Sequence, residues 1–121
     1  MKSIDELLES SKNLPFDEQI KFICDKIQDD ENLKIIDKDL QPTGPNMFLS
    51  VQVPGITEND ICFICLERER KQKYIISIWT KQRESQTSLK RSKVQDISEI
   101  DNVKKLLFLF IEKVVLMRQN K

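Results

Sequence analysis

The 121-residue sequence contains no histidine and only two glycines, Gly44 and Gly55. Histidine is the commonest general base and the commonest zinc ligand, so its absence removes the most frequent kinds of catalytic and metal site. Neither glycine belongs to a glycine-rich loop of the kind that cradles phosphates. These absences favour a function other than catalysis, and the sequence predicts no cofactor and no metal site.

Long hydrophobic runs are also lacking. The longest apolar stretch, 106–117, is interrupted by Glu112 and Lys113 and is shorter than the ~18 residues that span a membrane. The N-terminus turns acidic at once and has no apolar segment typical of a signal peptide. Three cysteines, an odd number, are typical of a reducing compartment. We therefore expect an intracellular protein, cytoplasmic or nuclear, with no membrane insertion.

The net charge is zero, but the charges are unevenly distributed along the chain. Residues 1–40 hold 11 acidic and 6 basic side chains, whereas residues 81–121 hold 5 acidic and 10 basic ones. This polarity either guides a charged partner or lets the two ends attract each other within one fold. The length predicts a single domain, 1–121, with a helical arm over 1–14 and a core over 15–121.

Helical periodicity marks both ends of the chain. Ser3 and Glu6 have the spacing of a capping box at the start of a short helix. A second helix is predicted over 16–27, where apolar residues recur every three or four positions. Near the C-terminus, Ser98 offers a cap for a long helix that ends near Arg118.

The middle of the chain has the pattern of strands. Residues 47–53 alternate in polarity, and residues 61–66 and 74–79 are almost continuously apolar, as in central strands. The polar connection 67–73 is short enough for a hairpin, and the polar segment 81–96 fits either a weak edge strand or a loop. The sequence thus predicts an α+β fold with two N-terminal helices, a four-stranded antiparallel sheet and a long C-terminal helix packed on it.

The predicted C-terminal helix is apolar over far more than the arc of about 100° that a surface helix normally shows. Its main apolar side consists of Val103, Leu106, Leu107, Phe110, Val114 and Met117. Phe108, Ile111 and Val115 widen that side, and Leu109 and Leu116 lie nearly opposite to it. Either the N-terminal helices cover these flanks, or a second molecule covers Phe108, Leu109 and Leu116, as a partner protein or as another copy of the chain.

Cys62 and Cys65 have the Cys-x-x-Cys spacing found in metal and redox motifs. Residues three apart on a strand point to opposite faces of the sheet, so these two thiols are not expected to bind one ion or to form a disulfide. We interpret them as small buried residues.

Basic residues gather on both sides of Trp79, the only tryptophan. The candidate nucleic-acid-binding residues are Trp79, Arg68, Arg70, Lys73, Lys81, Arg83, Lys90 and Arg91. Cations bind phosphates and an aromatic ring stacks on a base, so this combination suits single-stranded nucleic acid. A solvated loop rich in charge accounts for the same residues.

Residues 61–81, with Ile61-Cys62, Arg68 and the run Tyr74-Ile75-Ile76-Ser77-Ile78-Trp79-Thr80-Lys81, resemble a strand pair in the messenger-RNA cap-binding translation initiation factors. In that family a tryptophan on such a strand touches the methyl group of the cap, while basic residues before it contact the phosphates. The resemblance implies that Trp79 would meet a methylated base, and that Arg68 or Arg70, with Lys73, would meet phosphate. The family also stacks the cap between two further tryptophans, which this chain lacks.

Two functions remain open from the sequence. The first is a non-enzymatic protein-interaction module, such as an adaptor, an inhibitor or a complex subunit, that binds a partner protein or itself through the C-terminal helix or a sheet edge. The alternative is an RNA- or cap-binding module built around Trp79.

Overall fold

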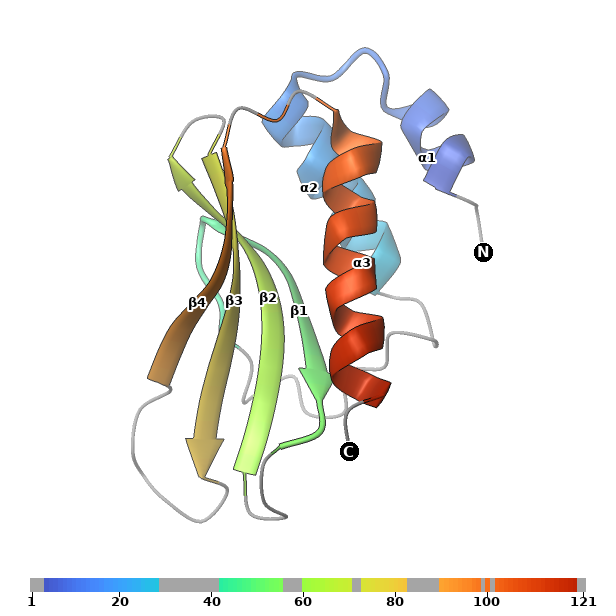
Figure 1. Cartoon of the computed structure of the whole chain (residues 1–121). Coiled ribbons are helices and arrows are strands. Elements are labelled where there is room, and N and C mark those ends of the chain that lie inside the picture. Colours follow the sequence, from blue (N-terminus) through green and yellow to red (C-terminus); the bar gives the residue numbers. More distant parts are fainter. Residues whose placement is uncertain are drawn as a thin grey trace.

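A computed structural model of the chain describes residues 4–28, 42–55, 60–70, 73–82, 90–98, 100 and 102–119, with the side chains at 82, 93 and 98 excepted. The elements in chain order are α1 (Ile4–Ser10), α2 (Phe16–Gln28), β1 (Met47–Val53), β2 (Asp60–Arg70), β3 (Lys73–Gln82), β4 (Lys90–Ser98) and α3 (Val103–Gln119). The four strands form one antiparallel sheet, and the helices lie together on one side of it (Figure 1). The predicted α+β fold is therefore confirmed.

The sheet has the strand order β1-β2-β3-β4, so every strand pairs with its neighbour in sequence. Ile64 at the centre of β2 lies opposite Val51 of β1 on one side and opposite Ile78 of β3 on the other. The chain just after β1 has room only for glycine at position 55, because a Cβ atom there would come within 2.8 Å of the Asp60 carbonyl oxygen. A larger residue at this position would push the chain away from the start of β2.

The hairpin between β2 and β3 is tighter than the sequence predicts. The polar stretch expected to be a connection continues both strands, since Arg68 pairs with Tyr74 and Arg70 pairs with Lys73 across the ladder. Backbone hydrogen bonds do not depend on side-chain polarity, so an apolar pattern that stops does not end a strand. Arg68, Arg70 and Lys73 are consequently strand residues, and the strand pairing shifts register between Arg68 and Arg70.

The polar segment that fitted either a loop or an edge strand contains β4. Residues 90–98 pair with β3, and Ile97 is buried against the helices. Residues 83–89 of this segment lie outside the described part of the chain.

The main core fills the space between the sheet and the helices. Both α2 and α3 pack on β1, α3 also contacts β2, and α1 adds Leu7 from the side of α2. The fully buried side chains at the centre of this core include Ile20, Ile23, Leu49, Ile64, Leu66, Ile76, Leu106 and Phe110. Burying residues of this size supplies most of the free energy that holds the helices on the sheet.

The opposite face of the sheet is also apolar and buried at its centre. Ile61, Phe63 and Cys65 of β2 form a second cluster there, with Met47 and Trp79 packed against it. This explains why β2 reads as a continuous apolar run, because both of its faces are buried. As the spacing predicted, Cys62 lies in the helix-side core and Cys65 in the opposite cluster.

The start of α3 is capped by a residue other than the predicted one. The Asn102 side chain accepts a hydrogen bond from the backbone N–H of Lys105 at 3.1 Å, and the Asn102 carbonyl accepts one from Leu106. Ser98, the predicted cap, belongs to β4 instead. Ser3, the other predicted cap, is outside the described residues. None of the described helices is long and apolar enough to cross a bilayer.

Candidate functional site

Helix α3 divides into a buried side and an outer side. Val103, Leu106, Leu107, Phe110 and Val114 are buried against the sheet and α2, and at 100° per residue they occupy one side of the helix. This is the side predicted from the periodicity of the sequence, except that Met117, also predicted for it, is only partly buried. Packing against the sheet and α2 therefore does not explain the remaining apolar residues of the helix.

Three large apolar side chains stand on the outer side. Phe108 is 49% exposed, and Val115 and Leu116 are each 46% exposed. Leu109, predicted to join the interface, is half-buried against the edge of the core. Val115 was not among the predicted interface residues, although it stands seven positions after Phe108 and so lies on the same side of the helix.

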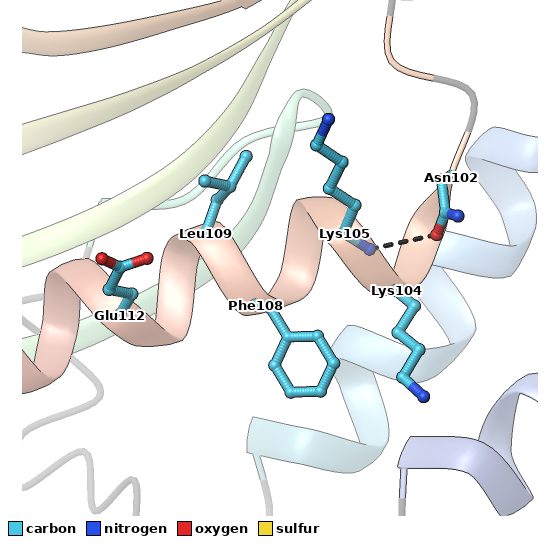
Figure 2. A pocket seen from close by; sticks show the side chains of 6 residues that line it. All are labelled: Asn102, Lys104, Lys105, Phe108, Leu109 and Glu112. Carbon is cyan, nitrogen blue, oxygen red and sulfur yellow. Dashed lines mark hydrogen bonds between the residues drawn. The ribbon is translucent and has the colours of Figure 1, made fainter.

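A shallow open hollow lies on the N-terminal half of this outer side (Figure 2). Its lining consists of Asn102, Lys104, Lys105, Phe108, Leu109 and Glu112, and its volume is about 360 Å³. Figure 2 shows Lys105 and Leu109 projecting from one side of the helix and Lys104 and Phe108 from the other. The hollow thus combines apolar surface with charges of both signs.

The charged side chains around the hollow differ in whether they have an ionic partner. Lys104 forms an ion pair with Asp5 of α1 at 2.8 Å, and its ammonium lies 5.7 Å from the centre of the Phe108 ring. Lys105 and Glu112 are exposed, and neither side chain has a hydrogen-bonding or ionic partner within the described part of the chain. Lys104 therefore fastens α1 to α3, whereas Lys105 and Glu112 are available to a second molecule.

Trp79 belongs to a polar network on the face of the sheet away from the helices. Its indole N–H donates a hydrogen bond to the Glu67 carboxylate at 3.0 Å, the Ser77 hydroxyl donates a second, and the Arg91 guanidinium lies 3.3 Å away. Glu67 and Ser77 are buried, while the Arg91 side chain is 42% exposed. The carboxylate thus joins residues of β2, β3 and β4 through one acceptor group.

The hairpin end of the sheet carries a separate group of predicted nucleic-acid residues. Arg68 donates to the Asp17 carboxylate of α2 at 2.7 Å, and the Tyr74 hydroxyl donates to the other oxygen of the same carboxylate. Burial, followed by the hydrogen bond to Asp17, raises the pKa of the Tyr74 phenol. These contacts fasten α2 to the sheet, so Arg68 has a structural partner. Lys73 lies 3.7 Å from Glu69.

The predicted nucleic-acid residues do not converge on one place. Lys73 and Trp79 are six residues apart on β3, which at about 3.3 Å per residue separates them by roughly 20 Å. The strand pairing places Arg91 directly opposite Trp79, and Lys81 follows two positions along β3. Lys90 pairs with Thr80 and is exposed on the helix side, as expected from the alternation of the strand. Arg83 lies outside the described residues.

None of the three cysteines forms a disulfide, and all three are buried. Burial raises the pKa of the Cys65 thiol to about 12, and the Ser50 hydroxyl oxygen lies 3.6 Å from its sulfur. Burial also raises the pKa of Cys24. Protonated, buried thiols are poor nucleophiles. The described residues contain no group of three or more potential metal ligands.

Comparison of the chain with protein-family models, with curated protein sequences and with solved structures gave no match.

Proposed function

We propose that this protein is a non-enzymatic interaction module whose outer side of α3 binds a protein, either a different one or a second copy of this chain. The observation that carries the proposal is the exposure of Phe108, Val115 and Leu116 on a helix whose other side packs into the core. Single exposed apolar residues are ordinary, but several on one helix beside a hollow are typical of a surface that a partner covers. The mixed charges around them provide the polar rim of such an interface.

The outer side of α3 is favoured over the sheet edge as the binding surface. The edge strand β4 begins with Lys90 and Arg91, both exposed, and basic side chains on an edge disfavour the addition of another strand. The outer side of α3 offers large apolar side chains and an open hollow instead.

Substitution of exposed apolar residues by glutamate tests this proposal. We expect Phe108→Glu and Val115→Glu to abolish capture of partner proteins in quantitative affinity purification, while the unfolding midpoint stays close to that of the parent protein. Leu14→Glu and Val94→Glu are matched controls, because these residues are 39% and 41% exposed but lie away from α3, between α1 and α2 and on β4. Equal capture by all four variants would place the binding surface elsewhere.

A second candidate function is binding of single-stranded RNA or of a cap-like nucleotide at Trp79. The observation that favours it is the placement of Arg91 opposite Trp79, with Lys81 two positions further along β3. A base could stack on the exposed part of the indole while the cations contact phosphate. Because Trp79 is the only tryptophan, its fluorescence reports this site alone. Titration with a short RNA and with a methylated-guanine nucleotide at low salt should quench it, and unchanged emission would refute this candidate.

A further inference from the structure

Lys105 and Glu112, two charges with no ionic partner among the described residues, lie on either side of the apolar centre of the hollow on α3. Lys105 and Glu112 are seven positions apart, so they lie on the same side of the helix and about 10.5 Å apart along its axis. That separation is too large for an ion pair between them. Along the helix axis, Phe108 and Leu109 lie midway between the two charges, and their side chains project to either side (Figure 2). Along the helix, the surface therefore presents a cation, then an apolar pair, then an anion.

A complementary surface must present the same three features in the opposite order. It needs an anion opposite Lys105, apolar residues opposite Phe108 and Leu109, and a cation opposite Glu112. The outer side of α3 itself meets this description when it is turned end to end. Two-fold symmetry produces this relation, because each residue i of one copy then meets residue j of the other, and j meets i.

We propose that the occupant of this surface is a second copy of the chain, bound through antiparallel packing of the two α3 helices. This inference rests on the proposed function of α3 as an interaction surface and names its partner. The two-fold axis passes beside Phe108 and Leu109, the midpoint between residues 105 and 112. Each Lys105 then pairs with the other copy's Glu112, and each Phe108 ring enters the hollow of the other copy.

The charges of the chain favour this arrangement over its alternatives. A parallel pairing of the helices in register would bring Lys105 against Lys105 and Glu112 against Glu112, which is repulsive. Lys104 stays with Asp5 of its own chain, so it does not compete for Glu112. The whole chain has a net charge of zero, so two copies experience no overall repulsion as they approach.

Charge reversal tests the proposed pairing with full-length protein. Sedimentation velocity over a range of concentrations should show that the parent chain self-associates to a dimer. Lys105→Glu and Glu112→Lys should each dimerise about 10- to 30-fold more weakly, because each creates two like-charge contacts in place of two ion pairs. An equimolar mixture of the two variants should regain the dimer, since every contact in the mixed pair is again between opposite charges.

The same set of proteins contains the control. Lys21→Glu makes the same charge change at an exposed position of α2, away from the hollow, and should dimerise as the parent does. A parent chain that stays monomeric at every concentration overturns the inference, as does a mixture no more dimeric than its two components.

Failure of the dimer is distinguishable from failure of the proposed function. If the parent is monomeric but Phe108→Glu still abolishes capture of another protein, the outer side of α3 binds a different partner and a second copy is not its occupant. If Phe108→Glu changes neither dimerisation nor capture, both proposals fail.

Discussion

Removal of the Glu67 carboxylate is the sharpest test of how the sheet is held together. In Glu67→Ala the Ser77 hydroxyl, which is fully buried, loses its acceptor, and the indole N–H of Trp79 loses one at 3.0 Å. Each unsatisfied donor costs about 1 to 3 kcal/mol, whereas the 42% exposed Arg91 side chain can be solvated by water. We expect the free energy of unfolding to fall by about 3 to 5 kcal/mol, a large part of a typical domain's stability.

Urea unfolding followed by far-ultraviolet circular dichroism measures this loss. Fluorescence serves as a second, local readout, since the emission of Trp79 should shift when its hydrogen bond is lost. Ser77→Ala added to Glu67→Ala should cost less than the sum of the two single changes, because donor and acceptor are then both absent.

Glu69→Ala is the matched control, with the same charge change two positions along β2 on an exposed side chain that lies 3.7 Å from Lys73. We expect it to cost less than about 1 kcal/mol. Equal losses for Glu67→Ala and Glu69→Ala would refute the burial and the connectivity of the network around Glu67.

Three further predictions concern other elements. Asp17→Asn should lower the pKa of Tyr74, the only tyrosine, in an absorbance titration. Since the pKa of Tyr74 is raised in the folded protein, the stability that this residue contributes is present below about pH 10 and is lost as the pH rises beyond that. Asn102→Ala should reduce the free energy of unfolding by about 1 kcal/mol in urea, because the backbone N–H of Lys105 loses its acceptor. Phe110→Ala should cost about 3 to 5 kcal/mol in the same assay, against less than about 1 kcal/mol for Phe108→Ala, because one ring is buried and the other is half-exposed.

The fold was accessible from the sequence because its elements are set by local apolar spacing. The 3.6-residue period over 16–27 and over the C-terminal helix, and the apolar runs of β2 and β3, each indicate which face is buried without reference to the rest of the chain. Backbone pairing is not encoded in this way. The length of the β2–β3 hairpin and the choice between loop and strand at β4 depend on neighbours in space, so the sequence left them open or misplaced them.

The candidate sites were less accessible because they depend on contacts between distant residues. The partner of Arg68 is Asp17, 51 positions earlier, and that of Trp79 is Glu67 across the strand pair. A list of basic residues in sequence order cannot distinguish an arginine that holds a helix from one that faces solvent. Within α3, the helical period correctly separates the buried side, but whether Leu109 or Val115 is more exposed depends on how the helix is rotated on the sheet.

The distribution of the three thiols gives the fold a set of built-in reporters of local opening. Cys24 lies in the helix layer, Cys62 lies beneath the helices on the sheet, and Cys65 lies on the opposite face. The packing around each sulfur must open before a thiol reagent can reach it, so the modification rate of each cysteine measures how often that part of the fold opens. If the helices detach from the sheet while the sheet stays intact, Cys24 and Cys62 will react together and Cys65 will lag behind. The order of the three rates would thus show which layer of the molecule separates first.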